Sequence, residues 1–141
     1  MEDEIRILFN NLRLLGCDLT MLQKATRVQV NSQMFQKANH KGMALLVHTL
    51  LCLFDEKTIR AQFQQCWFPY SMVEMRDFKQ VAAKVIDELV HKNKLGATDL
   101  TKGVMETAAG IRMWQSLRAV SDACLFDRLN QNANIVGRGI P

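Results

Sequence analysis

The chain has 141 residues, of which 48% are hydrophobic and 23% charged, as in an ordinary globular protein. This length predicts one domain that buries about 70% of the surface of its unfolded chain. A formal net charge of +4 and a pI near 9.0 suit an acidic partner, but the blocks of Lys and Arg typical of nucleic-acid arms are absent, so we expect no nucleic-acid binding.

The N-terminal third predicts two helices and an irregular connection. Residues 2–15 carry apolar side chains at helical spacing and acidic residues in the first turn, and Gly16 supplies the stop. Residues 17–25 predict a short helix capped by Asp18. Residues 26–32 have too few β-branched side chains for a strand, so we expect an irregular segment there.

The most apolar stretch is NHKGMALLVHTLLCLFD, residues 39–55. Between Met43 and Phe54 only His48 and Thr49 are polar, and none is charged. A helix that is apolar nearly all round is surrounded by its neighbours. It is too short to cross a bilayer, which needs roughly 20 apolar residues, so we expect no membrane contact. The stretch therefore predicts the buried central helix of an all-α domain.

Several residues are expected to position and fill this central helix. Asn39 can cap it, and Met34 and Phe35 precede it as apolar residues directed to the core. The helix residues expected to be buried are Leu45, Leu46, Leu50 and Leu53.

Two further helices are predicted downstream. Asp55 can cap the first, and Pro69 is expected to end it, because the residue before proline is pushed out of helical geometry. Ser71 and Glu74 have the spacing of a capping box, and the most regular amphipathic pattern of the chain follows them.

The C-terminal part is less regular until its last helix. Residues 93–110 predict a looser stretch with a short helix around 100–106, and residues 111–129 predict the last helix. Residues 130–141 are polar and contain glycine, so we expect a frayed tail.

The cysteines and the N-terminal residues favour the cell interior. Glu2, Asp3 and Glu4 are the opposite of the basic start of a secretory leader. The cysteines form no CxxC pair and mostly have apolar neighbours, which predicts reduced, buried thiols. They are Cys17, Cys52, Cys66 and Cys124.

Catalysis has little support in the sequence. Cys52 lies one helical turn from His48, but its apolar neighbours predict an inert thiol of raised pKa. Phosphate-binding and nucleophile-elbow motifs are absent from the sequence. His40, His48 and His91 lack the converging ligands that a metal site needs. We therefore expect no enzyme, no metal and no cofactor.

Two pairs of lysines are the candidate binding residues. Lys37 and Lys41 lie beside the start of the central helix, and Lys79 and Lys84 lie on the outer face expected for the next long helix. Together they could form a weak electrostatic footprint for an acidic polymer. For each lysine taken alone, a solvated helix face is the alternative.

Several motifs resemble the family of the N-terminal domain of augmin (HAUS) complex subunit 6. In order they are LLGCD from Leu14, MFQKAN from Met34, the apolar helix with Asp55, FQQCWFP from Phe63 and GIRMWQSL from Gly110. They span roughly residues 9–125. The family usually has proline directly after the tryptophan that stands here as Trp67. It also commonly has a second glycine before the one that stands here as Gly110. Here Phe68 precedes Pro69, and Ala108 and Ala109 stand before Gly110.

This resemblance implies a single calponin-homology-like domain, residues 1–129, of the kind found in kinetochore microtubule-binding subunits. Residues 130–141 would then lead to a coiled coil. The resemblance also implies a non-catalytic module of augmin, which binds microtubules and recruits the gamma-tubulin ring complex for branching nucleation. Implied partners are other augmin subunits, among them a calponin-homology-like sister. Implied locations are the cytoplasm, cytoskeleton, mitotic spindle and centrosome.

Alternatives remain open at two levels. Within augmin, the domain either touches tubulin through Lys37, Lys41, Lys79 and Lys84 or serves as a docking piece beside another microtubule-binding subunit. Outside augmin, the alternative is another calponin-homology-like adaptor that binds tubulin, actin, or a kinetochore or ciliary complex.

Overall fold

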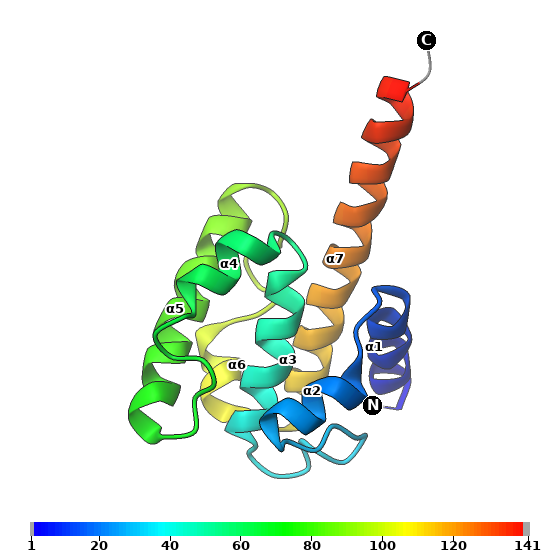
Figure 1. Ribbon diagram of the computed structural model, residues 1–141. Helices are drawn as coiled ribbons and strands as arrows, with labels where there is room; N and C mark the ends of the chain where they lie inside the picture. The colour runs from blue at the N-terminus through cyan, green and yellow to red at the C-terminus, as the bar shows by residue number, and fades with distance from the viewer. Residues whose placement is uncertain (1, 140–141) are drawn as a thin grey trace.

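A computed structural model describes residues 2–139, with side-chain environments for residues 2–132, and this part of the chain is all-helical, as predicted. Figure 1 shows the helices gathered into one body, from which the C-terminal part of the last helix projects. The helices are α1 (Glu2–Leu14), α2 (Leu19–Thr26), α3 (His40–Cys52), α4 (Glu56–Gln62), α5 (Met72–His91), α6 (Lys102–Thr107) and α7 (Gly110–Gly139). None of these helices combines the length and apolar character needed to span a membrane.

Helix α3 is the most buried element of the described chain. Ten of its thirteen residues are buried, and it packs against α4, α5, α6 and α7. In Figure 1 it lies between α5 and the first half of α7. The predicted burial of Leu45, Leu46 and Leu50 is confirmed, whereas Leu53 is only half-buried. The nearly uniform apolar character of α3 thus reflects neighbours on most of its sides.

The segment before α3 fixes its first turn. The Asn39 side chain accepts a hydrogen bond from the Gly42 amide (2.8 Å) and donates one to the Met34 carbonyl (3.2 Å). Phe35 is 1% exposed and meets the ring of Trp114 edge-on, at a centroid distance of 4.9 Å. The predicted cap and core residues are therefore confirmed.

Helices α1 and α7 lie side by side (Figure 1) and are joined by polar contacts. The buried Asn11 amide donates to Ser121 Oγ (2.9 Å) and Asp122 Oδ1 (2.8 Å). Arg118 pairs with Glu4 at 3.1 Å. These contacts satisfy a buried amide that would otherwise destabilise the pair.

The predicted end of α4 at Pro69 is wrong. The helix ends at Gln62, and tight turns follow, with the Cys66 amide donating to the Phe63 carbonyl. These turns bury both Phe63 and Cys66. Phe68, the residue that departs from the family pattern, is buried in a second apolar cluster with Val28 and Leu45.

The tail also differs from the prediction. Helix α7 continues past Leu129 to Gly139, so residues 130–139 are helical rather than frayed. Extending an existing helix adds one hydrogen bond for each residue fixed, and no proline lies between Leu129 and Pro141. Residues 140–141 of the predicted tail lie outside the described residues.

Candidate interaction surface

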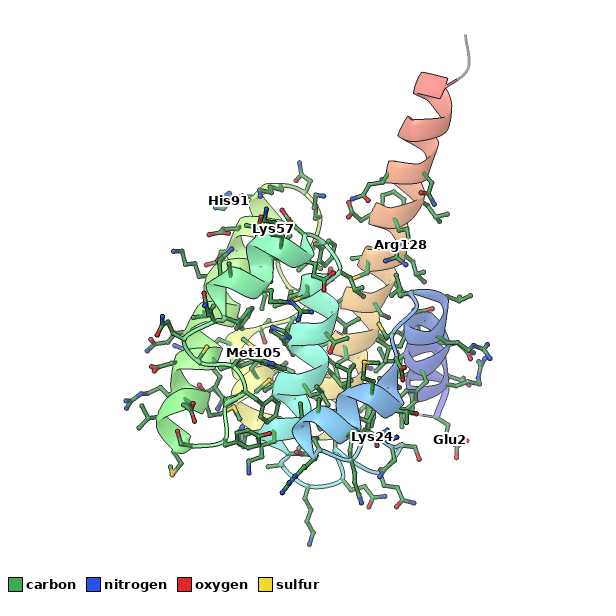
Figure 2. All side chains as sticks on the ribbon, viewed as in Figure 1. Glu2, Lys24, Lys57, His91, Met105 and Arg128 are labelled. Atoms are coloured by element: carbon green, nitrogen blue, oxygen red, sulfur yellow. The ribbon has the colours of Figure 1, made fainter. Side chains whose placement is uncertain are left out.

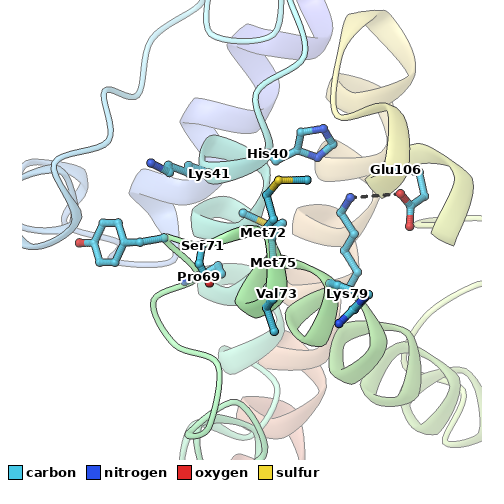
Figure 3. A pocket seen from close by; sticks show the side chains of 11 residues that line it. His40, Lys41, Pro69, Ser71, Met72, Val73, Met75, Lys79 and Glu106 are labelled. Atoms are coloured by element: carbon cyan, nitrogen blue, oxygen red, sulfur yellow. Dashed lines mark hydrogen bonds and ion pairs between the residues drawn. The ribbon is translucent and has the colours of Figure 1, made fainter.

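A hollow of about 720 Å³ opens beside the first turns of α3 and α5 (Figure 3). The segment between α4 and α5 forms one wall, and Glu106 of α6 contributes to another. Most of the lining is apolar, but basic side chains stand among it. The lining residues are His40, Lys41, Pro69, Tyr70, Ser71, Met72, Val73, Met75, Arg76, Lys79 and Glu106.

The start of α5 is held by a complete capping box, as predicted. Ser71 Oγ accepts a hydrogen bond from the Glu74 amide (3.1 Å), and the Ser71 amide donates to Glu74 Oε1 (3.2 Å). These two bonds fix the first turn of the helix. The turn presents Met72 and Val73, which are 91% and 58% exposed.

Basic groups border the hollow on two sides. Figure 3 shows Lys41 on one side and the Lys79–Glu106 pair on the other. Lys41 Nζ lies 5.7 Å from the centre of the Tyr70 ring, within cation–π range. Lys79 Nζ lies 3.1 Å from Glu106 Oε2, so its charge is already matched.

His40 lines the same hollow from the first residue of α3. Its Nδ1 atom is buried and has no hydrogen-bond partner among the described residues. Burial lowers the pKa of His40, and the charge of Lys79 lowers it further, while Glu106 opposes them. The ring therefore favours its neutral form, and its buried Nδ1 atom makes no hydrogen bond within the described chain.

The four predicted lysines occupy different surroundings. Lys37, Lys41 and Lys84 are exposed and form no ion pair among the described residues. The expected outward position of Lys79 is wrong, because its side chain is 12% exposed and paired with Glu106. The hollow brings Lys41 and Lys79 together, but neither Lys37 nor Lys84 lines it.

The exposed side chains of Glu2 and His91 point away from the helical body (Figure 2). Lys94, at the far end of α5, pairs with Asp127 at 3.0 Å and so joins that end to α7. Cations on this domain are thus divided between structural ion pairs and a solvated surface.

The His48–Cys52 pair is not arranged as a nucleophile and base. Cys52 Sγ lies 3.6 Å from His48 Nε2, and the His48 ring stacks on Trp67 at 3.7 Å. Burial raises the pKa of Cys52 to about 11 and lowers that of His48 to about 4. Near neutral pH the thiol and the imidazole are both neutral, so neither a thiolate nor an imidazolium is available.

The remaining cysteines resemble core residues. Cys66 and Cys124 are buried and Cys17 is half-buried, and burial raises the pKa of each thiol. All four cysteines are free. No group of three or more His, Cys, Asp or Glu side chains in the described chain could hold a metal ion.

The apolar part of the hollow was not predicted from the sequence. Met72 and Val73 fall outside the three- and four-residue apolar repeat of α5 that includes Phe78 and Ala82. Two large apolar residues in the first turn, outside the buried face of the helix, are the signal that could have indicated this surface.

Comparisons with known proteins bear on the chain as a whole. Residues 8–141 match the family described as HAUS augmin-like complex subunit 6 N-terminus. Comparisons with curated proteins and with solved structures gave no match. Because the family match spans nearly the entire chain, the protein belongs to the HAUS augmin-like complex subunit 6 N-terminal family.

Proposed function

We propose that this chain is a non-catalytic, calponin-homology-like head module of augmin, built round α3, that works beside microtubules. The observation that carries the proposal is the family match over residues 8–141, which implies augmin membership and other augmin subunits as partners. In this proposal one partner is a calponin-homology-like sister subunit. The assembled complex binds microtubules and recruits the gamma-tubulin ring complex at the spindle and centrosome. Family membership also favours augmin over other calponin-homology-like adaptors.

The proposal places the folded domain in residues 1–129 and continues α7 into a coiled coil. Helix α7 runs on past Leu129 without interruption to Gly139. Phe126 and Leu129 are 66% and 65% exposed on the projecting part of that helix. Apolar side chains exposed on a projecting helix suit packing against a second helix.

In the first of the two roles within augmin, the domain contacts tubulin directly, and this contact is electrostatic. Lys37, Lys41 and Lys84 are the exposed cations that support it, whereas Lys79 is engaged by Glu106. Exposed ion pairs contribute about 0.2–1 kcal/mol each, so the isolated domain should bind in the micromolar range or more weakly. Avidity within the complex then supplies the working affinity.

The test is microtubule co-sedimentation of the wild type and a Lys37→Glu/Lys41→Glu/Lys84→Glu variant at two salt concentrations. We expect wild-type binding to fall as salt rises, since the Debye length shortens to about 8 Å at 0.15 M. The variant should pellet several-fold less. A control with the same charge change, Lys24→Glu/Lys57→Glu/Lys102→Glu, alters three other exposed lysines.

If the triple variant is folded by circular dichroism and pellets as the wild type does, direct tubulin contact is wrong. The domain then serves as a docking piece, with microtubule affinity in another subunit. The hollow beside Met72 favours this second role, because an exposed apolar surface suits a protein partner better than the acidic surface of tubulin.

A further inference from the structure

The hollow gathers an unusual share of the exposed apolar surface. Tyr70, Met72 and Val73 are 54%, 91% and 58% exposed, and all three line it. One exposed methionine needs no explanation, but a contiguous apolar patch beside a hollow marks an interaction site. The capping box at Ser71 holds this patch in place before any partner arrives.

The charged side chains that line the hollow are mostly basic, although acidic side chains would suit its position in the fold better. It lies at the N-terminal ends of α3 and α5, where helix dipoles favour negative charge. The first turn of α5 has Glu74, but the first turn of α3 has no acidic residue and carries the cation Lys41 instead. Arg76 adds another cation, while Glu106, the acid of the lining, is already paired with Lys79. Such local conflict is characteristic of functional sites.

A small anion fits these observations less well than a peptide. The Gly42 amide at the start of α3 is taken by Asn39, and the Glu74 amide at the start of α5 is taken by Ser71. These amides would otherwise help to bind a phosphate. What stays available is the apolar surface and the basic rim.

We propose that this hollow binds an amphipathic, carboxylate-bearing segment of another augmin subunit. Its apolar side chains pack on Tyr70, Met72 and Val73, and its carboxylates face Lys41 and Arg76. This arrangement is the helix-in-groove mode of peptide recognition, with charge complementarity setting the orientation. The proposal rests on augmin membership for the source of the segment but not on the contact of Lys37 or Lys84 with tubulin.

The first test places a photo-cross-linking residue, p-benzoylphenylalanine, at Met72 in the full protein co-expressed with the other augmin subunits. We expect a cross-link that maps to a segment with apolar side chains at three- and four-residue spacing and acidic side chains beside them. Met21, which is 65% exposed on α2, is the matched control position. The proposal is overturned if position 72 cross-links no more than position 21, or if the product maps to a segment without carboxylates.

The second test measures assembly of Met72→Asp and Arg76→Glu variants by pull-down, with Met21→Asp and Arg112→Glu as controls. The first pair should weaken assembly at least tenfold and the controls should not. Exchanging a mapped carboxylate for lysine should restore assembly of Arg76→Glu. Normal assembly of both hollow variants would overturn the proposal, as would Arg76-dependent binding to phosphatidylserine vesicles without an effect on assembly. Failure of the wild type to assemble would instead overturn the proposed function.

Discussion

His48 is the polar side chain most deeply set among aromatic rings. It is 5% exposed, stacks on Trp67 at 3.7 Å and meets Phe63 edge-on at 5.0 Å. It thus joins the buried helix α3 to the turns that follow α4. The neutral ring supplies packing, and burial raises the pKa of Cys52, one turn later, to about 11, so that its thiol stays protonated near neutral pH.

Stability should fall when the medium is acidified through the range in which His48 titrates. The pKa of His48 is about 4 in the folded protein and 6.5 in the unfolded chain, so the unfolded state takes up the proton first. The contribution is fully present above pH 6.5 and lost between pH 6.5 and 4. It amounts to at most about 3 kcal/mol. Urea unfolding at several pH values measures it.

The control separates this effect from the titration of carboxylates. His48→Phe keeps an aromatic ring against Trp67 but cannot titrate, so its free energy of unfolding should depend less on pH between 7 and 4.5. His91→Gln, at an exposed position, should keep the wild-type dependence. Equal pH dependence of wild type and His48→Phe would show that the buried histidine is not responsible.

Residue environments could be predicted only where the cause lies nearby in sequence. Burial of Leu45, Leu46 and Leu50 followed from the apolar run on one helix. Lys79 has a polar pattern around it, but its partner Glu106 is 27 residues away, and no local periodicity shows that contact. Burial of Lys79 therefore could not be predicted.

At the scale of elements, α3 stabilises the domain by burying its apolar side chains. Leu50→Ala should lower the free energy of unfolding by about 2–5 kcal/mol, because Leu50 is 0% exposed and its truncation leaves a cavity. Leu14→Ala, at a side chain that is 67% exposed, should change stability by less than about 0.5 kcal/mol. Chemical denaturation measures both. A loss below about 1 kcal/mol for Leu50→Ala would mean that α3 is not central to stability.

Helix starts were predictable because their chemistry is local. Asp18, Asn39, Asp55 and Ser71 each accept a hydrogen bond from an amide in the first turn that follows. Helix ends were predictable only in part. Gly16 follows α1 in a left-handed backbone conformation, as expected of a helix stop, whereas α4 ends at Gln62 and tight turns follow it. Leu129 does not end α7, since polar side chains alone do not stop a helix.

At the scale of the molecule, the packed helices leave an exposed hollow beside the starts of α3 and α5. The all-α class followed from helical periodicity alone, but the hollow forms only where the start of α3, the segment before α5 with the start of that helix, and Glu106 of α6 meet. Of its basic residues, Lys41 and Lys79 were candidates from the sequence, and Arg76 was not. A surface formed by separate elements is visible only once they are packed.

Co-expression of the full protein with the other augmin subunits, followed by size exclusion, tests most directly whether the domain is a docking module of augmin. We expect the chain to co-elute stoichiometrically with a calponin-homology-like sister subunit. We also expect Met72→Asp to release the chain and Met21→Asp to leave it bound. If the folded wild-type chain elutes alone while the other subunits assemble without it, the domain is not a docking module of augmin, and the central claim is wrong.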